Sequence, residues 1–281
     1  MNFNRRTFLK STLAASAATA LTSKLAAAPA VDAGRDFYEL RCYKLHAGSR
    51  IKTDANPALL DAYLEHAFLP ALDQRGVKNV GVFTEIVVQK EAATSTPKPD
   101  SPVWVLIPHA TPDSFVAISA DLNADPAVQK AGADYLNVPK AHPAFERIDS
   151  WFLRAFAGLP KLELPAFSRN RMPTRVFELR DYESHSELKA LNKMAMFNDG
   201  EIALMKDLGM SPVFYGQALA GPDLPHLRYL TGAADLATHL ANWKTFGAHS
   251  RWAAMKDLPK YADNTSRITS RFVVPKSYSQ I

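Results

Sequence analysis

The 281-residue chain holds a single cysteine, Cys42, so no intrachain disulfide can form. A Gly-x-Ser-x-Gly nucleophile elbow, a phosphate-binding loop and a dinucleotide fingerprint are all absent from it. The eight histidines form no His-x-His or His-x-x-x-His pair, so the sequence predicts no metal site. Stability therefore depends on packing. None of the functions that these motifs mark is indicated by the sequence.

Long apolar runs are also missing, which argues against a membrane span of about 20 strongly apolar residues. The nearest candidate, Ser11–Leu21, is short and rich in alanine, and it lies between a pair of arginines and a cluster of small residues near Ala28. This order is typical of a cleaved twin-arginine export signal over residues 1–30, and it predicts a periplasmic or secreted protein. A plain N-terminal helix and an uncleaved anchor are the alternatives. The signal residues are Arg5, Arg6, Phe8 and Leu9.

A strong charge of one sign is missing once this leader is removed. The whole chain has a net charge of +5, but residues 1–30 hold four basic residues and no acid, so 29 basic and 28 acidic residues remain. Nucleic-acid binding needs a clustered basic face on the folded domain. The composition therefore argues against a nucleic-acid partner.

A short phrase occurs twice, as Tyr-Glu-Leu-Arg-Cys-Tyr at 38–43 and Phe-Glu-Leu-Arg-Asp-Tyr at 177–182. A second phrase also recurs, as Arg-Ile-Asp-Ser at 147–150 and Arg-Ile-Thr-Ser at 267–270. Each first phrase precedes an amphipathic segment that ends at a glycine, which we expect to be a left-handed helix cap. The chain is therefore interpreted as two copies of one unit.

Each copy has the pattern of one β-α-β-β-α-β unit. Strands are expected at 37–45, 80–88, 103–107 and 148–156, and again at 175–182, 213–219, 227–230 and 268–274, with a loop at 91–102. Amphipathic helices that end at Gly76 and Gly209 follow the first strand of each copy, and the second of them carries Leu188 and Leu191 on its apolar face. Further helices are expected after Thr111, Asp125 and near Leu236.

The predicted fold class is α+β: tandem ferredoxin-like domains that pair through their open sheet faces as an intrachain dimeric α/β barrel. The predicted domains are a signal peptide at 1–30, a first domain at 36–157, a proline-rich linker at 158–173 and a second domain at 174–281.

The second copy resembles the NIPSNAP family of the dimeric α/β-barrel superfamily. The resemblance is carried by the phrase at 177–182, by Gly209 and the run 213–216, by Trp243, Phe246 and Trp252, and by the last strand at 268–275. It covers residues 174–281 well and residues 36–157 less closely. Gln217 and the His-Ser-Arg-Trp phrase at 249–252 depart from the family pattern. The resemblance implies the fold, but this family has no agreed catalytic residues to carry over.

Alternation along the two repeated strands places Glu39, Arg41 and Tyr43 on one face, and Glu178, Arg180 and Tyr182 on the equivalent face. Leu40 and Leu179 are expected to pack under the helices, so the polar sets are expected to point into the space between the sheets. Converging arginines, carboxylates and phenols there could bind an anionic or carbonyl ligand. Alternatively, each Glu–Arg pair fixes the register of the two domains.

Two aromatic residues, Tyr215 and Trp243, complete the ligand-binding candidates, because they could line an apolar pocket between sheet and helices. No catalytic residue is assigned. No cofactor is predicted, although related barrels can hold haem and His239 or His249 could serve as its ligand.

The leading hypothesis is an exported NIPSNAP-type protein that binds a small, partly apolar ligand or a protein partner. The alternative is a cofactor-independent or haem-using monooxygenase or isomerase of the dimeric α/β-barrel type, which rests on fold analogy alone. Assembly of the pseudo-dimer into a homo-oligomer stays open.

Overall fold

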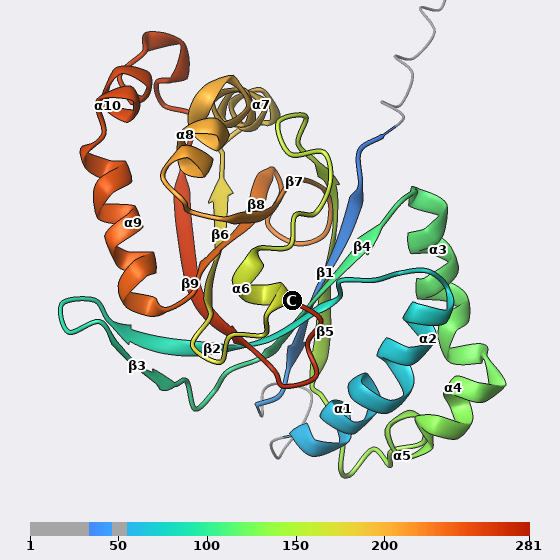
Figure 1. Ribbon diagram of the computed structural model, residues 1–281. Coiled ribbons are helices and arrows are strands. Elements are labelled where there is room, and N and C mark those ends of the chain that lie inside the picture. The colour runs from blue at the N-terminus through green and yellow to red at the C-terminus, as the bar shows by residue number, and fades with distance from the viewer. Residues whose placement is uncertain (1–33, 47–54) are drawn as a thin grey trace, which may run out of the picture. The chain divides into compact units, whose positions relative to one another are not determined.

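Eight strands close into a barrel in the computed structural model, which describes residues 34–46 and 55–281 (Figure 1). The strand order is β3-β2-β4-β1-β5-β7-β8-β6-β9, and an additional pairing of β2 with β9 joins the two ends. Only β3 lies outside the ring, as a short neighbour of β2. The α+β class and the closed barrel are therefore confirmed.

Both halves follow one common order of strand, helical segment, two strands, helical segment and strand, to which the first half adds β3 and the second half adds α6. In the first half the elements are β1 (Phe37–Lys44), α1 (Pro57–Tyr63), η1 (Leu64–Phe68), α2 (Leu69–Gln74), β2 (Gly81–Gln89), β3 (Thr94–Pro97), β4 (Val103–His109), α3 (Pro112–Asp121), η2 (Leu122–Ala124), α4 (Pro126–Ala131), α5 (Ala133–Leu136) and β5 (Arg147–Ala155). In the second half they are α6 (Ala166–Arg169), β6 (Val176–Glu183), α7 (Glu187–Met196), η3 (Phe197–Glu201), α8 (Ile202–Asp207), β7 (Pro212–Ala220), β8 (His226–Ala233), α9 (Leu236–Ala248), α10 (Ser250–Lys256), η4 (Pro259–Tyr261) and β9 (Arg267–Pro275).

The strands of each half have the same spatial order, β2-β4-β1-β5 and then β7-β8-β6-β9. The seams between the halves are the antiparallel pairs β5–β7 and β9–β2. Within each half the first strand pairs with the last, which places Arg41 opposite Ser150 and Arg180 opposite Ser270. The two repeated phrases of the sequence are therefore cross-strand neighbours in both halves.

The first helical segment of each half carries an unpredicted similarity. Both segments contain a π-helical turn, at 64–68 and at 197–201. Both end at a glycine with positive φ, 77° at Gly76 and 72° at Gly209, which confirms the predicted left-handed caps. The halves thus share local irregularities as well as strand order. The predicted loop at 91–102 was wrong in one respect, because it contains the short strand β3.

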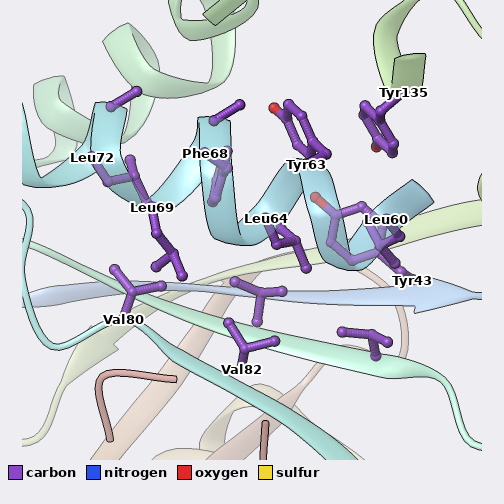
Figure 2. Packing of buried hydrophobic residues seen from close by; sticks show 14 of the residues in the cluster. Tyr43, Leu60, Tyr63, Leu64, Phe68, Leu69, Leu72, Val80, Val82 and Tyr135 are labelled. Carbon is purple, nitrogen blue, oxygen red and sulfur yellow. The ribbon is translucent and has the colours of Figure 1, made fainter. Parts of the chain in front are cut away.

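Buried apolar residues form three separate clusters. One lies inside the barrel and draws on strands of both halves, including Tyr38, Leu40, Phe177, Leu179 and Phe214. The other two lie between the outer face of each half's strands and its own helices. Figure 2 shows the first of these layers, in which Leu64 and Phe68 face Val82 across the helix–sheet interface.

One end of the barrel is filled by the segment that joins the halves. Leu162, Leu164 and Phe167, the last of these in α6, pack against the interior cluster. The fully buried Ile281 reaches the same cluster, and α6 and the C-terminus lie within the ring of strands in Figure 1. The predicted linker therefore also serves as part of the core.

Two expectations about side-chain direction were wrong. Leu40 and Leu179 point into the barrel and not under the helices. Leu188 and Leu191, expected on the buried face of their helix, are 75% and 50% exposed, since α7 buries the face that carries Ala190, Lys193 and Met194. Periodicity identified this helix but not its orientation, because the buried Lys193 pairs with the buried Glu201.

We expect Leu179→Ala to lower the free energy of unfolding by about 2–5 kcal/mol, because it opens a cavity in the interior shared by both halves. Both halves should unfold in one transition, measured by calorimetry and by urea titration. Leu188→Ala is the control, with a change within about 0.5 kcal/mol for an exposed side chain. Two transitions, of which only one responds to Leu179→Ala, would show that the halves have independent cores.

Candidate functional site

Glu178 is the centre of a polar cluster between β6 and α9. The side chain is 2% exposed, and its carboxylate accepts hydrogen bonds from Arg180 Nη1 at 3.0 Å, from the Ser270 hydroxyl and from the Trp243 indole N–H. The Nε2 atom of His239 lies 2.9 Å from Glu178 Oε2. Strand alternation puts Glu178 and Arg180 on one face of β6, and β9 supplies Ser270 from the neighbouring position.

Arg180 is held between aromatic rings. Its guanidinium carbon lies 4.4 Å from the centroid of the Trp243 ring and 5.6 Å from that of Tyr182. Its Nη2 donates to the Tyr182 hydroxyl at 3.2 Å, while its Nε is buried without a hydrogen-bond partner among the described residues. Such stacking stabilises a cation and fixes the orientation of its planar donors.

The environment of Glu178 keeps it ionised. Burial alone would raise its pKa, but the hydrogen bond from His239 and the charges of Arg180 and His239 outweigh burial and lower the pKa from 4.5 to about 2. The carboxylate is thus fully charged at neutral pH and is surrounded by donors. It acts as an anchor for Arg180, His239 and Trp243.

A cavity of about 440 Å³ opens beside this cluster, and we call it the α9 pocket. Glu178, Arg180, Trp243 and Phe272 line it, together with Lys244 of α9 and Lys90 from the hairpin between β2 and β3. Three cations therefore face the cavity, against one carboxylate whose hydrogen bonds are already made. The first half contributes Lys90, so the pocket is built by both halves.

The first half contains a similar but differently covered cluster. Glu39 accepts from Arg41 Nε at 2.6 Å and Nη2 at 2.9 Å, and from the Ser150 hydroxyl at 2.9 Å. Burial again opposes ionisation, yet the nearby His109, the charge of Arg41 and the hydrogen bonds from Arg41 and Ser150 lower the pKa of Glu39 to about 2. Phe68, 5.1 Å from the Arg41 guanidinium, covers this cluster where Trp243 covers the other.

The two polar sets do not converge, which corrects the expected placement of Glu39, Arg41, Tyr43, Glu178, Arg180 and Tyr182. Each set lies under the helices of its own half, and the barrel interior is mostly apolar near its middle. The physical reason is that a Glu–Arg pair needs hydrogen-bond partners, and partners such as His239, Trp243 and the cross-strand serines are available only on the outer face.

The remaining candidates divide between pocket and core. Trp243 lines the α9 pocket, as predicted, whereas Tyr215 is fully buried and its hydroxyl lies 2.9 Å from the sulfur of Met205. Tyr43 and Tyr182 are also buried, each in the helix layer of its own half. Tyr215, Tyr43 and Tyr182 thus support the two clusters from the core.

Sequence reasoning missed four contributors: Ser150, Ser270, His239 and Lys90. The two serines had a signal, because each ends the second repeated phrase and strand pairing places it beside the Glu-Leu-Arg phrase. His239 and Lys90 had none, since a helix and a distant hairpin bring them to Glu178 and Arg180.

The histidines considered for haem do not suit an axial role. His239 is 2% exposed with its Nε2 at Glu178, and the Nδ1 of His249 accepts a hydrogen bond from the Arg251 backbone at the start of α10. Within residues 34–46 and 55–281, no three His, Cys, Asp or Glu side chains are grouped so as to hold a metal ion.

We expect Glu178→Gln to lower the free energy of unfolding by about 3–5 kcal/mol at pH 7, because it leaves Arg180 buried without a counter-charge. The folded-state pKa lies below the unfolded value, so this stabilisation is present above pH 4.5 and is lost as pH falls toward 2. Over that window the wild type should lose about 3 kcal/mol through this group, and the two stability curves should converge.

Urea titrations from pH 7 down to the acid limit of folding measure both curves. The exposed Glu91→Gln is the control and should follow the wild-type curve. A constant gap between Glu178→Gln and wild type at every pH would contradict the assigned charge state.

Comparisons with known proteins match two segments of the chain. Residues 177–280 match the family model NIPSNAP, and residues 2–22 match the twin-arginine translocation signal sequence. No curated protein sequence matches the chain.

Some solved structures match most of the chain, and others match little more than a third of it. A candidate monooxygenase from Lactobacillus acidophilus NCFM aligns with a TM-score of 0.51 at 6% identity, over 86% of this chain and 94% of that one. A candidate monooxygenase from Fusobacterium nucleatum gives 0.50 at 6% identity, over 86% and 93%. An uncharacterised NIPSNAP-like domain protein from Burkholderia xenovorans gives 0.35 at 19% identity, over 38% of this chain and 89% of that one.

The export signal, including Arg5, Arg6, Phe8 and Leu9, lies outside the described residues. It directs the protein across the membrane, to the periplasm or beyond. None of the helices in the described part of the chain is both long and apolar enough to span a bilayer.

Proposed function

Since this exported chain carries a NIPSNAP domain at residues 177–280, we propose that it is a binding protein whose α9 pocket takes a small, partly apolar anion. The observation that carries the proposal is the stack of Arg180 on Trp243 at the wall of a cavity that also presents Lys90 and Lys244. An apolar wall with a few fixed polar groups is the usual form of a small-molecule site.

The electrostatics of the pocket favour an anion over a cation. The carboxylate of Glu178 is satisfied by Arg180, His239, Ser270 and Trp243, so it offers little to an incoming cation. Arg180, by contrast, keeps a buried Nε without a partner. Phe272 and the Trp243 ring supply apolar contact area beside these charges. A flat organic anion would meet both parts of the wall.

We further propose that residues 36–157 and 174–281 are two ferredoxin-like domains joined by the linker 158–173. Their common strand order, their paired π-helical turns and their matching glycine caps support a tandem duplication. On this interpretation the barrel is an intrachain pseudo-dimer. The α9 pocket then belongs to the second domain with one residue, Lys90, from the first.

Anilinonaphthalene sulfonate is a suitable probe, because it is a partly apolar anion that fluoresces when bound. We expect Trp243→Ala to raise its Kd at least tenfold, about 1.4 kcal/mol, through loss of the stacked wall. Lys244→Gln should weaken binding less than Trp243→Ala does. It should also reduce the salt dependence of binding, because the exposed Lys244 attracts the anion through solvent, where salt screens the attraction.

The matched control is Trp252→Ala, because Trp252 packs against the core of the second half and does not line the α9 pocket. Circular dichroism verifies that each variant is folded. Equal binding by wild type and Trp243→Ala would overturn the assignment of the pocket.

A second candidate is a cofactor-independent monooxygenase or isomerase. Fold similarity to two candidate monooxygenases over 86% of the chain favours it, as does the buried Glu178–His239 pair beside the pocket. Native mass spectrometry of protein exported through its own signal should identify a retained ligand, and oxygen uptake is then measured with that ligand. Turnover by wild type but not by His239→Gln would favour the enzyme, and tight binding without turnover would favour the binding protein.

A further inference from the structure

A second cavity, of about 450 Å³, opens at the end of the barrel opposite the linker, and we call it the barrel mouth. Its walls come from the end of β1 and the beginnings of β4, β5 and β8, through Cys42, Trp104, Trp151 and Arg228. The other end of the barrel is filled by Leu162, Leu164 and Phe167. The barrel therefore has one closed end and one accessible end.

Two tryptophans from the first half form a wall of the barrel mouth, and two arginines from the second half cover them. The Trp104 and Trp151 rings are stacked, with centroids 5.9 Å apart. The guanidinium carbon of Arg228 lies 3.6 Å from the Trp151 centroid, and that of Arg271 lies 5.3 Å from the Trp104 centroid. Both cations are held in place by aromatic faces, as in sites that recognise planar anions.

The two arginines of the barrel mouth share one carboxylate. Asp181 bonds Arg271 Nη1 at 2.6 Å and lies 3.0 Å from Arg228 Nε, so one carboxylate serves two arginines. Glu85 is taken by Lys98 at 2.7 Å and by the Trp104 indole N–H at 2.9 Å. Lys98 also lies 3.9 Å from Asp100, and Arg271 Nε lies 4.0 Å from Glu85. Among the described residues, Asp181 is therefore the one ion-pair partner of Arg228, and Arg271 shares it.

Arg228 has hydrogen-bonding capacity left over, although its Nε lies 3.0 Å from Asp181 and donates to His226 Nε2 at 3.2 Å. Its side chain is 3% exposed, and its Nη1 has no hydrogen-bond partner among the described residues. Burial, reinforced by the nearby charge of Arg271, lowers the pKa of Arg228 to about 10 despite the attraction of Asp181. A buried guanidinium nitrogen without a hydrogen-bond partner is costly, and an added anion that accepts from it would remove that cost.

The rim of the barrel mouth limits which anion fits. Lys44 is paired with Asp149 at 2.6 Å, and Asp100, Glu146 and Asp223 add negative charge at the opening. A ligand with two negative charges would be repelled there, while a single carboxylate can accept the hydrogen bond that Arg228 Nη1 leaves unmade. The aromatic wall favours a planar organic ligand over a hydrated inorganic ion.

We propose that the barrel mouth is a second ligand site, which binds the carboxylate of a small organic monoanion against Arg228 and Arg271. This site is separate from the α9 pocket and does not depend on the function proposed for it. The barrel mouth opens into the interior of the barrel, whereas the α9 pocket lies on the outer face of the sheet.

Benzoate is the probe, and the indole N–H signals of the four tryptophans in a ¹⁵N–¹H NMR spectrum report which site responds. Trp104→Phe and Trp151→Phe assign the two signals of the barrel mouth, and Trp243→Phe assigns that of the α9 pocket. We expect benzoate to shift the Trp104 and Trp151 signals saturably with a Kd of about 1 mM or tighter. Phthalate, a dianion, should bind more weakly and benzylamine should not bind.

Arg228→Gln should weaken benzoate binding at the barrel mouth at least tenfold, while the melting temperature of the free protein stays the same or rises. Arg271→Gln removes the other arginine of the site and serves as the second variant should the first fail to fold. Lys244→Gln is the control and should leave the Trp104 and Trp151 shifts unchanged. Unmoved signals at about 10 mM benzoate, equal shifts with sodium chloride, or full binding by Arg228→Gln would each overturn the proposal.

Discussion

Closure of the sheet is the constraint on which the other features depend. The pairs β5–β7 and β9–β2 use up the free edges of both halves, so all eight strands of the ring have two neighbours. The middle of the interior is then cut off from water, and Leu40 and Leu179 occupy it. The charged residues on the same two strands, such as Glu39 and Glu178, must therefore lie on the outer face, where helices and cross-strand serines solvate them.

Three charged residues of the second half gather at the accessible end of the barrel interior. Asp181, Arg228 and Arg271 follow the apolar layer along the same strands, close to the opening. The interior thus grades from the apolar plug around Phe167 to a charged mouth. The outer faces of the two halves also differ, because one is closed and the other is open. Phe68 covers the Glu–Arg cluster of the first half, while Trp243 forms the wall of a cavity beside the cluster of the second.

Much of the architecture could be predicted from local signals in the sequence. The duplicated phrases, the glycines at 76 and 209 and the strand pattern depend on short-range physics, and they led to the closed barrel. Which face of the two repeated strands points into the barrel could not be predicted. Alternation sorts the side chains into two faces but does not say which face meets the other half. The orientation of a helix was equally hard to predict. Leu188 and Leu191 are exposed, because α7 buries the face on which Lys193 pairs with Glu201. His239, Lys90 and Arg228 gain their significance from contacts far along the chain, which no spacing rule records.

The joining of two unlike halves in one chain has a consequence for how such a site can change. In a symmetric homodimer every substitution appears twice, so a residue that improves one site also alters its twin and both seams. Here Lys90 reaches the α9 pocket from the first half, and no symmetry mate has to be accommodated. One half is free to serve as scaffold while the other is selected for its ligand. The covalent link therefore allows two different sites to evolve on one closed barrel.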